Sequence, residues 1–399
     1  MRNNMRNNIY KLIIGGLMCL CLTGCQKAPE KVVEDMKEYG ENEQKKESEI
    51  TYCSPQELKN LDVKAIMEKG YSVRIPDNID FSRVEDVCEL TVKFKENFVA
   101  DYEKKYAELF GFDLSKLEES RGDKVVGGRL KQGDDEEKKI HYGIRDNGLL
   151  AYMSGHWFDD ATESKVEGRY DIFKDDIENV KIDFAGDSIR LSDMCKKSEE
   201  WFNTNIGTDT LTYNVTDALV RNVSYGSENV KRLSLCGEFA YKGIFFNNHL
   251  FDISEESGTE YTSILTNSVV SEYEAADDMV KLVVNDCLFE VTDAKKLDKI
   301  VDFESALRIV EEKLTGFRSF EFCDVMPLYV METVSDESGG IDPKAPGIEL
   351  KARPVYAFLE KGDLSSDEMP DDITIALNKY RRYVYVDMVT GEFVTDIEK

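Results

Sequence analysis

Residues 302–314 decide the fold that this sequence predicts, and they read Asp-Phe-Glu-Ser-Ala-Leu-Arg-Ile-Val-Glu-Glu-Lys-Leu. The apolar residues at positions 303, 306, 307, 310 and 314 recur at helical spacing and form one face. Asp302 is a favourable N-cap residue for such a helix. Three strand-like stretches follow, at 319–334, 349–359 and 382–394. Because a one-faced helix needs a sheet to cover it, this region predicts a helix packed on three strands.

The same order of elements occurs earlier in the chain. A predicted helix near 192–202 precedes predicted strands at 211–223, 233–246 and 279–291. The two regions also end alike, in Val-Thr-Asp at 291–293 and at 394–396. We therefore expect an α+β fold, with antiparallel sheets, helices packed on one face, and a helix-plus-three-strand module repeated in the C-terminal half.

The region before these modules carries its own signals. Residues 54–57 and 82–85 each form a capping-box pattern, and each predicts the start of a helix. An apolar stripe from Val84 to Leu109 predicts that the second helix is long and ends at Gly111. The pair Asn147-Gly148 predicts a two-residue turn between strands at 140–144 and 149–153.

These patterns divide the chain into five predicted parts. They are a signal peptide at 1–24, a charged flexible tether at 25–50, an N-terminal α+β domain at 51–185, a first module at 186–300 and a second module at 301–399. The tether is predicted from its Lys and Glu content and its few apolar residues.

The N-terminal segment combines three export features. Arg2, Arg6 and Lys11 precede a short apolar run, and the run ends in Leu22-Thr23-Gly24-Cys25. The segment resembles the lipobox signal of bacterial lipoproteins, position by position. That resemblance implies cleavage before Cys25 and attachment of a diacylglycerol to its sulfur, which would hold the protein at the extracytoplasmic face of the cell membrane.

The last hundred residues carry a second resemblance. The predicted helix is followed by Arg-Pro-Val-Tyr-Ala-Phe at 353–358, by Tyr-Val-Tyr-Val-Asp at 383–387, and by a turn at Thr390-Gly391-Glu392. This arrangement resembles a PepSY-type module, and modules of that kind usually bind or inhibit rather than catalyse. The whole layout also resembles uncharacterised clostridial lipoproteins, a likeness that offers no active-site residues.

Composition limits the classes of partner. The chain has 399 residues and a formal net charge of −28, and 41% of its residues are hydrophobic. A surface this acidic disfavours nucleic acid, and it suits cations or a basic partner protein. We therefore predict no nucleic-acid partner, a membrane contact through the lipid on Cys25, and a protein or cell-wall partner.

The cysteines indicate no metal site. Beyond the predicted export signal and Cys25 there are six, at Cys53, Cys88, Cys195, Cys236, Cys287 and Cys323. None belongs to a Cys-x-x-Cys pair, so a zinc site is not predicted. Most have apolar neighbours and are predicted to be small buried residues. The alternative is that one or two disulfides form, since the protein is expected outside the cytoplasm.

Residues 184–189, Phe-Ala-Gly-Asp-Ser-Ile, resemble the nucleophile block of GDSL-type esterases. A serine nucleophile needs a histidine base and an orienting acid. Only His141, His156 and His249 occur in the chain, and none follows the aspartate that the family pattern requires. The alternative is a turn between two strands, because Gly, Asp and Ser are turn residues. We expect the turn and no catalytic residue.

Two further groups of residues contain side chains that could bind a metal. His141 and His156 are expected on facing strands of the predicted hairpin, with Asp159 and Asp160 nearby, but two ligands are too few for a dedicated site. The acidic stretches 336–340 and 363–372 lack the ligand spacing of a calcium loop. We expect no metal, no cofactor and no phosphate-binding loop.

The sequence thus predicts a non-enzymatic surface lipoprotein that binds or regulates a partner. Two alternatives stay open at this point. A solute-binding lipoprotein of a transporter would show βαβ alternation around a cleft, and a hydrolase would need a catalytic base that the sequence does not reveal.

Overall fold

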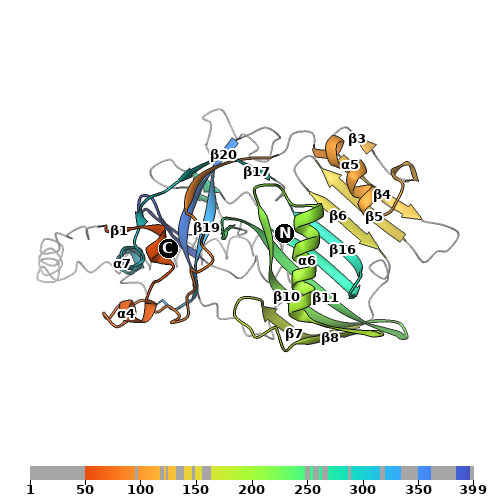
Figure 1. Cartoon of the computed structure of the whole chain (residues 1–399), viewed down its shortest axis with the longest axis horizontal. Helices are drawn as coiled ribbons and strands as arrows, with labels where there is room; N and C mark the ends of the chain where they lie inside the picture. The colour runs from red at the N-terminus through yellow and green to blue at the C-terminus, as the bar shows by residue number, and fades with distance from the viewer. Residues whose placement is uncertain are drawn as a thin grey trace, which may run out of the picture. The chain divides into compact units, whose positions relative to one another are not determined.

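The computed structural model describes residues 50–94, 98–116, 121–122, 125–131, 139–145, 149–154, 163–247, 252–254, 260–262, 268–285, 289–314, 320–333, 349–360 and 383–395. Strands dominate these residues, and the predicted α+β class is wrong (Figure 1). Four of the described strands have 12 to 14 residues each, whereas the three longest described helices have 12, 15 and 12 residues and the others have five or fewer. The molecule is therefore a mostly β protein in which a few helices accompany an extended network of strands.

One run of strands is antiparallel throughout. Its order is β3-β4-β5-β6-β16-β15-β11-β10-β7. The bounds are Arg121–Gly122, Val125–Lys131, Lys139–Arg145, Leu150–Ser154, Asp278–Asn285, Ser268–Ala275, Glu228–Tyr241, Thr212–Tyr225 and Glu163–Asp171 in that order. On β11, Leu233 and Leu235 belong to the main apolar core, whereas Cys236 packs with Leu219 and Val270 on the opposite face.

A second set of strands surrounds β20 (Glu349–Glu360). On one side β20 pairs with β19 (Phe322–Thr333), and on the other it pairs with β2 (Cys88–Phe94) and β21 (Tyr383–Asp387). Strand β17 (Phe289–Lys296) pairs with β2, and β22 (Phe393–Thr395) pairs with β21, both in antiparallel ladders. Strands β13 (Asp252–Ser254) and β14 (Glu260–Thr262) attach to the end of β19.

Strand β12 (Ile244–Phe246) links the two sets. It follows β11 after a tight turn and then pairs with β19, in a parallel ladder. The junction between the sets is thus made by consecutive residues of one chain segment. Two shorter pairs complete the strands, β8 (Lys181–Phe184) with β9 (Asp187–Arg190) and β1 (Tyr52–Cys53) with β18 (Ile300–Val301).

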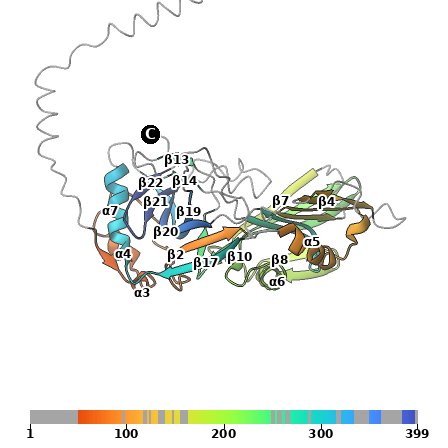
Figure 2. The ribbon, with the colours of Figure 1, turned by 90° about the horizontal axis from the view of Figure 1, so that it is seen from above.

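The helix predicted at 302–314 is present as α7 (Phe303–Leu314), beside β21 and β22 (Figure 2). Every apolar position of the predicted face is buried. Asp302 accepts a hydrogen bond from the amide of Ser305 at 2.6 Å, which caps the first turn as the sequence indicated. The predicted helix near 192–202 is α6 (Leu191–Asn205), which packs on β10 (Figure 1).

The two capping boxes have different outcomes. The first begins α3 (Pro55–Leu58), with Glu57 bonded back to the amide of Ser54 at 2.6 Å, and α4 (Val63–Met67) follows it. The second begins no helix, because residues 82–83 form a turn and the chain then enters β2. Only the last part of the predicted stripe is helical, as α5 (Phe98–Leu109), before a short 3₁₀ turn at Leu114–Lys116.

The repeated three-strand module is also corrected. The predicted strand at 279–291 is two strands with different partners, because β16 pairs with β15 and β6 whereas β17 pairs with β2. The sequence reading had also missed β15. Hydrogen-bonded ladders therefore join residues across the predicted boundaries at 185 and 300, for example between β6 and β16. The domain limits themselves stay predictions.

Candidate functional site

A cavity of about 250 Å³ lies where the two sets of strands meet. Its lining comes from the segment 78–84, from the end of β7 and the residues after it, and from β10, β11, β12, β19 and β20. Its apolar wall is formed by Val84, Phe173, Phe245, Val325, Met326, Pro327 and Leu359. All three parts of the folded chain that the sequence predicted contribute to it. The volume is just below the range of about 300–1,000 Å³ that is usual for small-molecule sites.

Carboxylates dominate the polar part of this lining. Asp80, Asp171, Asp217, Glu238 and Asp324 line the cavity, against two cations, Arg83 and Lys174. Glu238 is buried, with 7% of its surface exposed. A lining with this balance of charge favours a positively charged occupant over an anion.

The strand register places two of these acids together. Asp217 on β10 lies opposite Cys236 on β11, and a bulge at Thr216 precedes it. Glu238 is two residues beyond Cys236 and so points to the same face of the sheet. Asp217 and Glu238 are therefore diagonal neighbours across the ladder, within reach of one small ligand group.

Lys174 joins two other acids of the wall. Its ammonium lies 2.6 Å from Asp324 and 3.3 Å from Asp171. Burial alone would lower the pKa of Lys174, but the hydrogen bond with Asp324 and the two negative charges raise it above its ordinary value. Lys174 therefore stays charged and ties the chain after β7 to the start of β19.

Arg83 and Phe173 form the mouth of the cavity. The Arg83 guanidinium stacks over the Phe173 ring, 3.3 Å from its centroid, and Phe173 lies 5.9 Å from Phe245. Phe173 is 39% exposed, which is unusual among the large apolar side chains of the described chain. Although Arg83 is exposed overall, partial desolvation of its guanidinium lowers its pKa. An aromatic ring left open to solvent at a cavity mouth is a surface that a ligand could cover.

Hydrogen bonds fix the segment that carries Arg83. Asp80 accepts bonds from the amide and the hydroxyl of Ser82, at 2.7 and 3.0 Å, and these bonds lower the pKa of Asp80. The amide of Glu85 donates to the carbonyl of Lys242 at 2.9 Å, in the turn between β11 and β12.

Gly243 completes that turn and allows the close approach. Its φ of +80° lies in the region that favours glycine, and a Cβ at this position would collide with the carbonyl of Arg83. The site thus depends on a glycine as well as on charged groups. The sequence reading missed this turn, because it ran one strand from 233 to 246, although Lys242-Gly243 is a turn signal.

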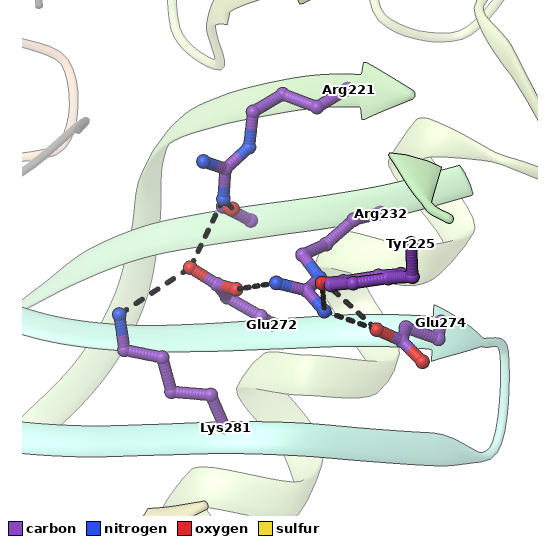
Figure 3. Close-up of polar contacts among 7 residues, drawn as sticks. Arg221, Tyr225, Arg232, Glu272, Glu274 and Lys281 are labelled. Carbon is purple, nitrogen blue, oxygen red and sulfur yellow. Dashed lines mark hydrogen bonds and ion pairs between the residues drawn. The ribbon is translucent and has the colours of Figure 1, made fainter. Parts of the chain in front are cut away.

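A network of buried charges lies farther along the same strands (Figure 3). Glu272 on β15 contacts Arg221 at 3.2 Å, Arg232 at 3.5 Å and Lys281 at 3.4 Å. Arg232 also forms an ion pair with Glu274 and donates a hydrogen bond to the hydroxyl of Tyr225. Arg221 donates a hydrogen bond to the hydroxyl of Ser234 at 2.9 Å. The side chains of Arg232 and Glu272 are about 5% and 4% exposed.

This network shares a face with the cavity. Arg232, Ser234, Cys236 and Glu238 alternate along β11 and therefore point the same way. Ion pairs as buried as these add little net stability, yet removing one partner is costly because a charge is left unpaired. The network joins β10, β11, β15 and β16, and so it fixes the strands that carry Asp217 and Glu238.

The esterase-like block is a turn, as expected. Ala185 and Gly186 connect β8 to β9, with Gly186 at a φ of +97°, and Ser188 lies on β9. The hydroxyl of Ser188 donates to Asp183 at 2.6 Å, and both residues are exposed. A carboxylate, and not a histidine, accepts this hydrogen bond, and the arrangement is that of a solvated hairpin.

The histidine pair cannot be assembled from the described residues. His141 lies on β5 opposite Met153, one residue away from the predicted partner Ser154, because the ladder places Ile140 opposite Ser154. His156, His249, Asp159, Asp160 and the acidic stretches 336–340 and 363–372 lie outside the described residues, as does Cys25. Within the described part of the chain, no group of three or more His, Cys, Asp or Glu residues could hold a metal ion.

Five of the six predicted body cysteines are free thiols, at Cys53, Cys88, Cys195, Cys236 and Cys323. Cys287 lies outside the described residues. Burial raises the pKa of Cys195 to about 12 and that of Cys53 to about 11, so neither is an activated nucleophile.

No protein-family model matches the chain, and no curated protein matches it significantly. Across the residues that the structure describes, no helix has the length and apolar character to cross a membrane.

Proposed function

We propose that the protein is a lipid-anchored lipoprotein at the extracytoplasmic face of the cell membrane, and that its body binds a positively charged ligand group in the junction cavity. The lipobox-like segment Leu22-Thr23-Gly24-Cys25 supports the anchoring. The cavity supports the binding, because carboxylates, an exposed aromatic ring and an apolar wall converge on a space of small-molecule size.

The negative charge of the cavity lining is the main support for cation binding. Asp217 and Glu238 share one sheet face at the wall, while Asp171 and Asp324 are joined by Lys174. An ammonium or guanidinium group with an apolar stem matches the two kinds of wall. The aromatic face of Phe173 adds a surface on which a cation is favoured.

A solute-binding role is the second candidate, and the size of the cavity favours it. A space of about 250 Å³ accommodates one small molecule or one side chain, and it is too small for a large ligand. A free solute and a side chain of a partner protein would use the same contacts.

Calorimetric titration of the full chain, purified in detergent, tests the proposal. The probe is 1,5-diaminopentane, and 1,5-pentanediol is its uncharged control of the same length. We expect the diamine to bind and the diol not to bind. Asp217→Asn and Glu238→Gln should each weaken diamine binding about tenfold, the equivalent of about 1.4 kcal/mol.

Asp187→Asn is the matched control, because Asp187 is an exposed carboxylate at the start of β9, outside the lining of the cavity. It should bind the diamine like the unaltered chain. Circular dichroism of each variant shows whether it is folded. Equal binding of the diol, or unchanged diamine affinity in both folded cavity variants, would refute a cation-selective cavity.

A further inference from the structure

The cavity is lined by a buried carboxylate and by an exposed guanidinium. Glu238 is buried in the wall, whereas Arg83 is exposed at the mouth. Apolar side chains, among them Val325 and Met326, contribute the remaining surface. A ligand that fills this space can therefore contact the buried carboxylate of Glu238 and the exposed guanidinium of Arg83, which lies near the carboxylates of Asp80 and Asp171.

Arg83 has unused donors at that mouth. A guanidinium carries five N–H donors in a planar fork. Arg83 makes no hydrogen bond and no ion pair with another residue of the described chain, and its contact with Phe173 uses the face of the guanidinium and not its N–H edge. Stacking holds the plane of the group while leaving the edge available, and a planar fork of this kind suits bidentate binding of a carboxylate.

We infer that the ligand is a basic amino acid, or a peptide that ends in one. This inference rests on the cation-binding function proposed above and adds a second anchor to it. The side-chain cation binds at Asp217 and Glu238, the aliphatic stem lies along the apolar wall, and the free carboxylate pairs with Arg83. A free amino acid and a peptide C-terminus share this chemistry, and the experiment below separates them.

The test compares probes that share the side-chain cation and differ at the carboxylate or at the α-amino group. The full chain in detergent is titrated with L-lysine, with L-lysinamide, with 1,5-diaminopentane and with the peptide Gly-Gly-Gly-Lys. L-lysine should bind at least tenfold more tightly than L-lysinamide or the diamine. If the peptide exceeds L-lysine in affinity, the source is a peptide C-terminus, and the reverse order identifies the free amino acid.

Arg83→Gln keeps a polar side chain and removes the charge. It should reduce the affinity for L-lysine to that for L-lysinamide while leaving the affinity for the diamine unchanged. Arg74→Gln is the control, because Arg74 is an exposed arginine outside the cavity and its pairing with Glu321 is through the backbone. It should bind all four probes like the unaltered chain.

The outcomes separate the two proposals. Equal affinity for L-lysine and L-lysinamide, or an unchanged preference in Arg83→Gln, would overturn the carboxylate anchor while the diamine still binds. If no cationic probe binds, the proposed function itself fails and the carboxylate anchor fails with it.

Discussion

The guanidinium of Arg83 lies 3.3 Å from the centre of the Phe173 ring, and this contact joins the turn before β2 to the chain that leaves β7. The two residues are 90 positions apart in the sequence, and neither belongs to a regular helix or strand. Their contact depends on the strands beneath them, since β7 and β11 bring the supporting turns together. The mouth of the cavity is therefore a product of the junction between the two sets of strands.

Gly243 should be essential to this junction. Gly243→Ala places a Cβ against the carbonyl of Arg83 and also imposes a positive φ on alanine. Gly226→Ala is the matched control, because Gly226 also has a positive φ, in the β10–β11 turn, but has open space around its Cβ position. We expect about 1 kcal/mol of destabilisation for the control and about 2 kcal/mol more for Gly243→Ala, by urea unfolding. Equal losses in the two variants would show that the close approach to Arg83 is unimportant.

Leu307 should be essential to the C-terminal packing. It is fully buried on α7, against the region of β21 and β22, and an aspartate there would be a buried charge without a partner. Leu307→Asp is expected to cost more than about 3 kcal/mol of unfolding free energy. Lys313→Asp introduces the same residue on the exposed side of the helix and should cost less than about 1 kcal/mol. Similar costs for both variants, measured in denaturant, would contradict the packing of α7.

The buried thiol of Cys195 should lower the free energy of unfolding at alkaline pH. Burial raises the pKa of this thiol from 9.0 to about 12, so the unfolded chain loses the thiol proton first as the pH rises. The stability linked to the neutral thiol is complete below pH 9 and declines from there toward pH 12. Relative to Cys195→Ala, the unaltered chain should lose about 1 kcal/mol between pH 8 and pH 10. Cys323→Ala, at an exposed thiol, should not alter the pH dependence, and a difference between Cys195→Ala and the unaltered chain that is constant with pH would exclude the proposed cause.

Lipidation at Cys25 is tested in the cell. Cys25→Ala removes the sulfur that the lipobox-like segment would present, so the chain should accumulate unprocessed or outside the membrane fraction. The measurement is metabolic labelling with a fatty acid, followed by fractionation. Cys53→Ala serves as the control and should retain label. Label that enters the Cys25→Ala chain at the level of the unaltered one would refute the assignment.

Local signals predicted several elements correctly. The apolar spacing of 303, 306, 307, 310 and 314 is regular enough to define α7, and the capping pattern at 54–57 defines α3. The strands on both sides of Asn147-Gly148 were also predicted, although their register is shifted by one residue. Each of these signals lies within a few residues of the element that it specifies.

The errors come from patterns that fit two periods. Cys88, Leu90 and Val92 are buried and alternate with Glu89 and Thr91, which is the period of a strand, yet the longer stripe around them favours a helix.

The cavity could not be predicted from the sequence for a different reason. Its wall is assembled from residues between Asn78 and Leu359, and the register that places Asp217 diagonally across from Glu238 follows from strand pairing and a bulge, which a single sequence does not encode locally.

A crystal structure of the full chain soaked with L-lysine would show directly whether the junction cavity binds a basic amino acid. We expect ligand density in the junction cavity, with the side-chain ammonium against Asp217 and Glu238 and the carboxylate facing Arg83. A cavity without ligand density at a concentration that saturates binding in solution, or lysine bound only at another surface, would contradict it.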